Sequence, residues 1–250
     1  MTHKHRVRQA FDRAAAGYDA AAELQRRVSD LLADRLPEPT PRRLLDAGSG
    51  TGYGLRLLAG RWPGAWCVAA DFARGMAERS GGVCADLEAL PFADGSFDLY
   101  WSSLAYQWCE AARAVAEAAR LLAPGGRLAV SSLGPGTLVE LAASFEGLDR
   151  HRHVRGFAPA EELVAACAGA GLADIRLETR RLTHYLPDVR TLLEELKALG
   201  ANQVGTDRRR GLLGRDAWRR IERRYEQQRQ AQGLPATYEV ILCLASKPSS

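Results

Sequence analysis

The chain has 250 residues, of which 46% are hydrophobic and 26% charged, with a formal net charge of +4. This composition excludes a mainly disordered, collagen-like or mucin-like chain, and the length suffices for one large domain with its own apolar core. No apolar run reaches the roughly 20 residues that a membrane-spanning helix needs, and no apolar stretch follows the basic start, Met1 to Arg8. We therefore expect a cytoplasmic protein with no membrane segment.

The first half of the chain alternates between helical and strand patterns. An amphipathic opening over residues 7–36 is predicted to be helical and to stop at the prolines that follow it. Strands are predicted at 43–47, 66–70, near Val83, at 97–102 and at 127–133, with helical patterns between them, notably at 53–59 and 111–122. Parallel strands require crossover connections, so this order predicts a doubly wound α/β core with a parallel sheet covered on both faces.

The second half continues the sheet but carries a long excursion. A helix is predicted at 160–170, a strand at 175–182 and a last strand at 238–245. Between the two strands, residues 183–235 are dominated by helix formers at 192–199 and 216–232, too charged for a core. We expect this excursion to form a helical cap or docking element.

Cysteines and histidines do not indicate a metal site. The five cysteines are scattered and form no Cys-x-x-Cys motif, which is typical of free thiols. The pairs His3/His5 and His151/His153 have no carboxylate or thiol neighbour at ligand spacing. We expect no metal ion.

The sharpest motif is the glycine-rich turn after the first predicted strand. Leu44-Leu45-Asp46 leads into Gly48-Ser49-Gly50-Thr51-Gly52, and a helical pattern follows. Such a turn lets a ligand approach the backbone and offers the unpaired N–H groups of a helix start. A tight connection between strand and helix without a ligand is the alternative.

Two acids indicate which ligand this turn would take. Dinucleotide sites use Gly-x-Gly-x-x-Gly, a different spacing, and Asp46 would repel a pyrophosphate but suits a cationic amino group. Asp71 ends the second predicted strand, where an acid can accept both hydroxyls of a ribose, with a helix N-cap as its alternative role.

These residues resemble class I S-adenosylmethionine-dependent methyltransferases. The likeness includes Asp46 to Gly52, then Leu90-Pro-Phe-Ala-Asp-Gly-Ser-Phe-Asp98 and Pro124-Gly-Gly126. It implies a Rossmann-like class I methyltransferase fold, with a doubly wound, mostly parallel seven-stranded sheet and a helical cap. We expect a single domain over 1–250, with N-terminal lid helices at 5–36 and the cap insertion at about 183–235.

The resemblance also implies S-adenosylmethionine as cofactor and the residues that bind it. Gly48 and Gly50 would face its methionine part, Asp71 the ribose, and Asp86 and Leu87 the adenine. The whole set of expected cofactor-binding residues is Asp46, Gly48, Ser49, Gly50, Asp71, Phe72, Met76, Asp86, Leu87, Ser102, Gln25 and Arg26.

Within that family, four stretches resemble the members that methylate the free carboxylate of a malonyl thioester on acyl carrier protein, the primer for pimeloyl and biotin synthesis. They are 11–19 with 24–26, 101–109, 196–202 and 237–240. The likeness implies Tyr18 as a lid over the cofactor and Gln107 and Trp108 in the wall facing the reacting centre. Trp101, Leu104 and Trp108 are alternatively only core residues.

An arginine is expected to grip the substrate carboxylate. Members of the family place it directly before a Phe-x-Pro turn, whereas this chain has Gly156 there and Arg155 one position earlier. We expect Arg155 in this role, together with Tyr18, Gln107 and Trp108 as catalytic residues. Arg150 and Arg152 are alternatives, and each of the three arginines could instead be a solvated surface charge. A carboxylate is already ionised at neutral pH, so no general base is needed.

An arginine-rich segment, residues 208–229, indicates an acidic partner. It holds nine arginines against three acids, so it would attract the acidic malonyl-acyl carrier protein, unless it is only a solvated helix. Nucleic acid is not expected, because the segment has few interleaved aromatic residues. We expect a monomer. The alternative functions are methylation of a free dicarboxylate or quinone precursor, or a binding module without catalysis.

Overall fold

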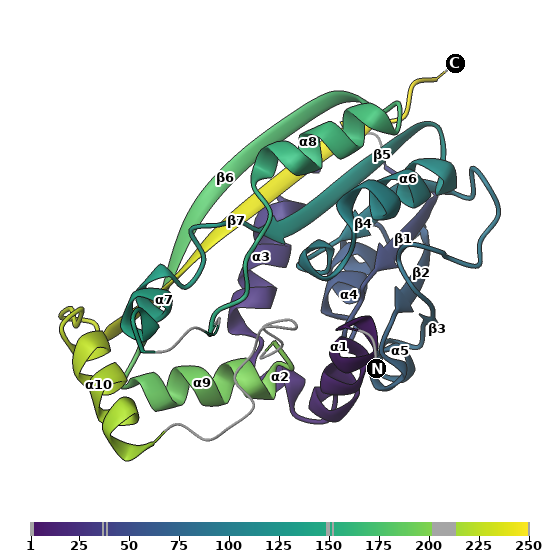
Figure 1. The fold of residues 1–250 in the computed structure, drawn as a ribbon. Coiled ribbons are helices and arrows are strands. Elements are labelled where there is room, and N and C mark those ends of the chain that lie inside the picture. The colour runs from purple at the N-terminus through teal and green to yellow at the C-terminus, as the bar shows by residue number, and fades with distance from the viewer. Residues whose placement is uncertain are drawn as a thin grey trace.

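A computed structural model of the chain describes residues 3–36, 38, 40–148, 151, 153–201 and 214–249. These residues form a seven-stranded sheet in the order β3-β2-β1-β4-β5-β7-β6 (Figure 1). The strands are β1 Arg43–Ala47, β2 Trp66–Asp71, β3 Val83–Cys84, β4 Phe97–Ser102, β5 Leu122–Leu133, β6 Ala173–Leu186 and β7 Leu234–Ser246. Because β7 runs antiparallel to both β5 and β6 while the other pairs are parallel, the predicted doubly wound, mostly parallel sheet is confirmed.

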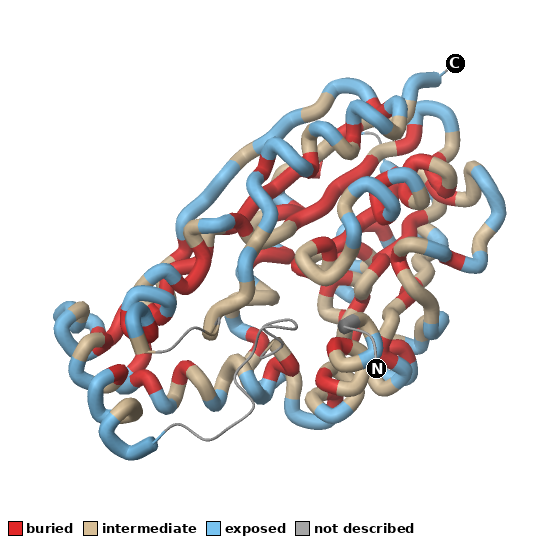
Figure 2. Tube along the Cα trace, in the orientation of Figure 1, coloured by how far each residue is buried: buried red, intermediate tan, exposed pale blue. Residues whose placement is uncertain are grey.

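Helices cover both faces of the sheet. They are α1 His3–Ala14, α2 Tyr18–Ala21, α3 Glu23–Ala33, α4 Tyr53–Arg61, α5 Arg74–Ser80, α6 Ala111–Leu121, α7 Val139–Phe145, α8 Ala160–Gly169, α9 Val189–Ala198 and α10 Arg215–Glu226, with a short 3₁₀ helix at Tyr106–Trp108. Neighbouring residues of β1 show the two layers, since Leu44 packs with α3 and α4 whereas Leu45 packs with α6 and α8. Side chains alternate along a strand, so a strand buried on both faces is apolar at consecutive positions. Figure 2 shows this buried centre flanked by more exposed helices.

The opening segment is broken into three helices. Gly17, at φ −110° and ψ 3°, and Ala22, at φ −89° and ψ 31°, lie outside helical geometry and separate α1, α2 and α3. Residues Phe11 and Tyr18 pack with Met76 of α5, so α1 and α2 lie over the edge of the sheet near its glycine-rich turn. The break turns a continuous amphipathic pattern into a bent cover, and it places Tyr18 at the start of α2.

Strands β6 and β7 are longer than the sequence predicts. They stay paired from Ala173 with Ser246 to Leu186 with Leu234, so 183–186 and 234–237 belong to the sheet and not to the expected excursion. The insertion between them therefore begins after Leu186 and ends before Leu234. It carries α9 and α10, held out at the end of the two strands (Figure 1). Helix α10 also ends at Glu226, earlier than the predicted 232, because the chain turns back through a bridge between Gln230 and Gly233.

Within the described residues, no helix is long and apolar enough to cross a membrane. The same part of the chain holds no group of three or more His, Cys, Asp or Glu side chains placed to bind a metal ion.

Candidate functional site

The glycine-rich turn lies at the carboxyl end of β1, between β2 and β4. The amides of Gly48 and Ser49 donate to the carbonyl of Ala70, at 2.8 and 3.0 Å. Gly48 has φ +77°, and a Cβ added there would lie 2.4 Å from the Cβ of Ala105. The turn therefore requires glycine at this position, and it leaves space over the backbone.

Asp71 ends β2 beside this turn. Its carboxylate accepts the amides of Gly50, at 2.9 Å, and of Ala73, at 2.8 Å. Ala73 itself is the N-cap residue of α5, and that helix has no side-chain cap, so Asp71 closes a turn before the helix and does not take the alternative N-cap role. Burial raises its pKa to about 6, against the opposing effect of the two amides.

A first cavity of about 90 Å³ opens beside Asp71. Six of the expected cofactor-binding residues line it together with Asp71: Gly48, Gly50, Phe72, Met76, Asp86 and Leu87. Lys4 of α1 also lines it, and its Nζ lies 2.7 Å from a carboxylate oxygen of Asp86 and 2.7 Å from one of Glu88. No sequence motif marks Lys4, and only the docking of α1 brings it to this cavity.

A second, smaller cavity of about 50 Å³ lies on the other side of the turn. Asp46, Ser49, Gln25 and Arg26 line it, with Trp101. One polar atom on each of Asp46, Gln25 and Trp101 is buried and has no hydrogen-bond partner among the described residues, namely Oδ2, Oε1 and Nε1. Burial raises the pKa of Asp46 to about 7. Unpartnered polar atoms of this kind fit a small ligand with a charged amino-acid part.

A third and larger cavity, of about 290 Å³, adjoins the first two. Tyr18 lines all three, and Phe11, Leu104 and Trp108 line both the first and the third. Its other walls are mostly apolar and include Leu133, Leu138, Leu141, Leu193, Leu196 and Leu199. Tyr18 therefore stands where a ligand in the first two cavities would meet a ligand in the third.

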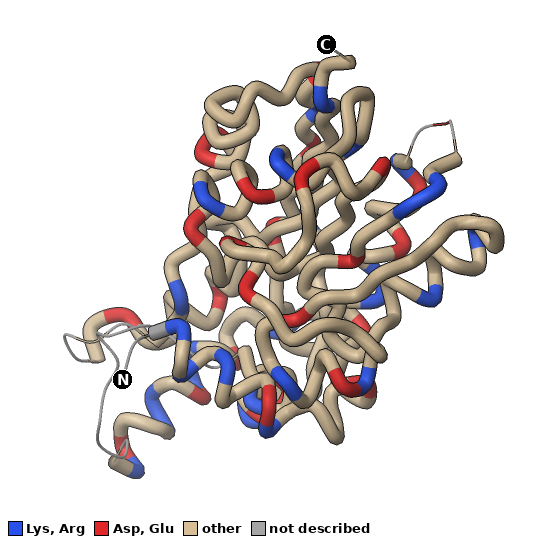
Figure 3. Tube along the Cα trace, turned by 90° about the vertical axis from the view of Figure 1, so that its right-hand side faces the viewer, with Lys and Arg blue, Asp and Glu red and all other residues tan. Residues whose placement is uncertain are grey.

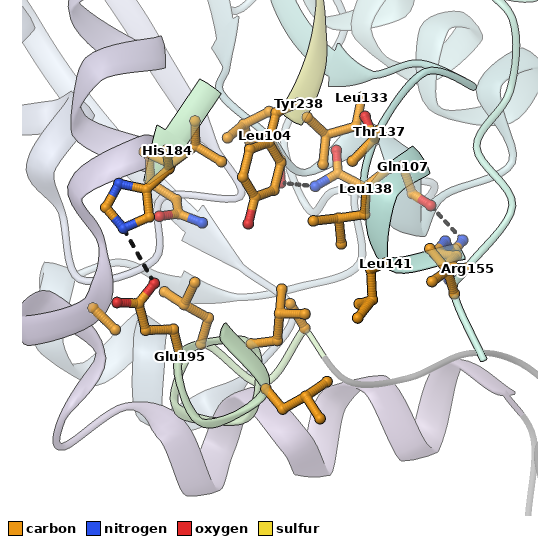
Figure 4. Close-up of a pocket in the computed structure, with 18 of the residues that line it drawn as sticks. Leu104, Gln107, Leu133, Thr137, Leu138, Leu141, Arg155, His184, Glu195 and Tyr238 are labelled. Carbon is orange, nitrogen blue, oxygen red and sulfur yellow. Dashed lines mark hydrogen bonds and ion pairs between the residues drawn. The ribbon is translucent and has the colours of Figure 1, made fainter. Parts of the chain in front are cut away.

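Arg155, Gln107 and Trp108 are brought together in the wall of the third cavity. Figure 4 shows Arg155 beside Gln107. The guanidinium of Arg155 donates to the carbonyl oxygen of Gln107 and lies 4.5 Å from the ring centre of Trp108. Trp108 in turn packs edge to face against Phe11, with ring centres 5.5 Å apart. Burial lowers the pKa of Arg155, but an arginine keeps its charge at neutral pH.

Ser102 is the one expected cofactor-binding residue that the structure does not place on a cavity wall. It is fully buried at the end of β4, whereas Trp101 lines the second cavity and Ser103 lines the first and second. Side chains of a strand alternate between its two faces, so Trp101 and Ser103 share a side that Ser102 does not. The Oγ of Ser102 is nonetheless buried without a hydrogen-bond partner among the described residues, so Ser102 stays a prediction and Ser103 is added beside it.

Other expected residues lie partly outside the described part of the chain. Arg150, Arg152 and the start of the basic segment, with Arg208, Arg209 and Arg210, fall there. On α10, Arg215, Arg219, Arg220 and Arg223 are exposed. Arg224 donates to the carbonyl of Glu146, and Arg229 contacts Glu226 and the carbonyl of Pro187.

Residues 45–130, which include the glycine-rich turn, match the methyltransferase domain family. A malonyl-[acyl-carrier protein] O-methyltransferase of Dechloromonas aromatica (strain RCB) is 48% identical, over 98% of this chain and 95% of that protein. The biotin biosynthesis bifunctional protein BioHC of Cellvibrio japonicus (strain Ueda107) is 44% identical, over 98% of this chain and 50% of that protein.

A solved structure shares the fold. Phosphoethanolamine N-methyltransferase 2 of Haemonchus contortus, in complex with S-adenosyl-L-methionine, has a TM-score of 0.57 and 16% identity, over 95% of this chain and 57% of that chain. The sequence relatives extend over almost the whole chain at much higher identity. The chain belongs to the family of malonyl-[acyl-carrier protein] O-methyltransferases.

Proposed function

We propose that this protein transfers a methyl group from S-adenosylmethionine to the free carboxylate of a malonyl thioester on acyl carrier protein, and that the methyl ester primes pimeloyl and biotin synthesis. The observation that carries the proposal is Arg155 in the wall of the third cavity, which meets the other two at Tyr18. The names of the relatives, which act on malonyl-[acyl-carrier protein] or in biotin biosynthesis, support the choice of acceptor.

The first two cavities fit S-adenosylmethionine, which supplies an electrophilic sulfonium methyl when bound. Asp71 would accept the ribose hydroxyls, and Asp86 and Leu87 would flank the adenine. Asp46 and Gln25, with their unpartnered oxygens, would hold the amino-acid part. Phe72, Met76, Ser49, Arg26 and Ser103 complete the walls. Ser102 keeps its proposed role through its buried Oγ, which has no hydrogen-bond partner among the described residues.

Positioning is the catalytic contribution of the acceptor cavity. The malonyl carboxylate is an anion at neutral pH and needs no proton removed before it attacks. Arg155 would bind one of its oxygens and leave the other to face the methyl group near Tyr18. Alignment of this kind contributes up to about 7 to 11 kcal/mol of the barrier reduction. Burial raises the pKa of Tyr18, so its phenol stays neutral and shields the reacting centre instead of acting as a base.

We place the docking site for the acidic carrier protein on the arginines of α10. Arg215, Arg219 and Arg223 recur every four residues along this helix and are exposed, so they share one face of it. By contrast, positive and negative residues are interspersed on the face of the molecule shown in Figure 3. The proposed active form is a monomer.

The test uses labelled S-adenosylmethionine with malonyl-carrier protein, malonyl-coenzyme A and free dicarboxylates. We expect a gain of one methyl group on malonyl-carrier protein, removed by alkaline ester hydrolysis. Transfer only to a free acid would contradict the proposed acceptor while leaving the cofactor assignment intact. For the docking site, the variant with both Arg219→Glu and Arg223→Glu should raise KM for malonyl-carrier protein but not for malonyl-coenzyme A.

A further inference from the structure

The wall of the acceptor cavity away from Arg155 carries polar groups that the methyl transfer does not use. His184 comes from β6, Glu195 from α9 and Tyr238 from β7, and all three line the 290 Å³ cavity. In Figure 4, Arg155 and the pair His184–Glu195 lie on opposite sides of the cavity, with Tyr238 between them. The cavity thus has a positive side and a side with a carboxylate.

Glu195 is held in this wall by its neighbours. Its Oε2 lies 3.5 Å from Nε2 of His184, and about one third of each side chain remains exposed. Leu193, Leu196 and Leu199 of the same region line the cavity beside it. An apolar surrounding strengthens the repulsion between this carboxylate and any anion placed in the cavity.

Tyr238 offers a neutral hydrogen-bond donor at the same wall. Its ring is almost fully buried, and its hydroxyl points into the cavity (Figure 4). Burial and the negative charges of Glu195 and Glu140 raise its pKa, so the hydroxyl keeps its proton at neutral pH. A donor beside a carboxylate suits an uncharged carbonyl group and disfavours a second carboxylate.

We propose that Glu195, with Tyr238 and His184, selects acceptors whose end remote from the reacting carboxylate is uncharged. This inference rests on the proposed function. A malonyl thioester presents one carboxylate, to Arg155, and a neutral carbonyl, to Tyr238. Free malonate presents a carboxylate at both ends, and the second one meets the charge of Glu195. The insertion that carries α9 therefore takes part in substrate discrimination as well as in docking.

The experiment compares two small competitors that differ in this charge. Malonate is a dianion at about pH 8, whereas monomethyl malonate has one carboxylate and one neutral ester carbonyl. Their inhibition constants are measured against methylation of malonyl-carrier protein. In the unaltered protein, monomethyl malonate should bind more tightly than malonate. The measured quantity is the inhibition constant of malonate divided by that of monomethyl malonate. Glu195→Gln should lower this ratio by about tenfold, mainly because malonate binds more tightly.

Two further variants make the result specific. Glu194→Gln removes the same charge from the neighbouring position of α9, which is exposed and does not line the acceptor cavity, so it should leave the ratio unchanged. Tyr238→Phe should weaken monomethyl malonate more than malonate, because only the neutral carbonyl loses its donor. Its response keeps the inference testable if Glu195→Gln does not fold.

The inference is overturned if Glu195→Gln and Tyr238→Phe both leave the ratio within about twofold of the original while malonyl-carrier protein is still methylated. It is also overturned if monomethyl malonate does not compete at all. If the unaltered protein binds S-adenosylmethionine but does not methylate malonyl-carrier protein, the proposed function itself fails, and that outcome is recognised before any variant is made.

Discussion

Replacing Arg155 with glutamine tests the proposed grip on the substrate carboxylate. The change removes a charge that lies half-buried in the acceptor cavity, 4.5 Å from the ring of Trp108 and bonded to the carbonyl of Gln107. A hydrogen bond to a charged group contributes about 1.5 to 3 kcal/mol net, so a loss of about 2 kcal/mol predicts a roughly 30-fold fall in kcat/KM for malonyl-carrier protein.

The assay separates acceptor binding from donor binding. Steady-state kinetics with malonyl-carrier protein gives kcat/KM, and calorimetry with S-adenosylhomocysteine gives the affinity of the donor site. The donor-site affinity should change by less than about twofold, because Arg155 does not line the first two cavities. Arg176→Gln is the matched control, because it removes the same charge from an exposed position of β6, eight residues before His184. Unchanged kcat/KM in Arg155→Gln would refute the assignment and direct attention to Arg150 or Arg152.

Three further changes test the donor site. Asp71→Asn should weaken donor binding roughly 30-fold by calorimetry. In the unaltered protein, donor affinity should fall as the pH drops through about 6, because the carboxylate of Asp71 becomes protonated. The variant should not show this pH dependence. If the variant still loses donor affinity near pH 6, the pH dependence does not come from Asp71. Gly48→Ala should lower the free energy of unfolding by about 1 to 2 kcal/mol or more, because the backbone φ at this position is +77°. In the same denaturation series, Gly60→Ala is the control. No atom lies within 4 Å of its added Cβ, so it should stabilise the protein slightly. Lys4→Met should raise the dissociation rate of the donor several-fold in stopped-flow measurements, since the ion pair with Asp86 holds α1 over the first cavity; an unchanged rate would show that α1 does not retain the ligand.

The alternation of helices and strands is a local property, and the sequence predicted it well. Strand β1 reads as consecutive apolar residues because both of its faces are buried. The glycine-rich turn was equally recognisable, since a positive φ at Gly48, Gly50 and Gly52 leaves glycine as the favoured residue. These patterns were enough to place the proposed donor site at the carboxyl ends of β1 and β2.

The differences from the prediction arise where distant segments pack. That Ser103 lines the first two cavities was missed, because it lies just after β4 and only the packing of the turn around it brings it there. The ends of β6 and β7 were underestimated because their pairing with each other, at residues such as Thr183 and Thr237, extends them beyond the apolar pattern.

The acceptor cavity shows the same limit most clearly. Its walls come from α1, α2, α9, β6, β7 and the loops before α7 and α8, which are distant in the chain. The stretch 237–240 was one of the four that resemble the family, but nothing local placed the hydroxyl of Tyr238 opposite Arg155.

The sequence by itself therefore determined the fold class, the glycine-rich turn and the family, because apolar periodicity, turn glycines and strand-end acids are set by interactions between near neighbours. Only the tertiary structure decided how Tyr18 joins three cavities, how Lys4 reaches Asp86 and how Glu195 comes to face Arg155 across the acceptor site. Those relations depend on strand register, on the bend after α1 and on long-range packing, which fix the direction of each side chain only when the whole chain has folded.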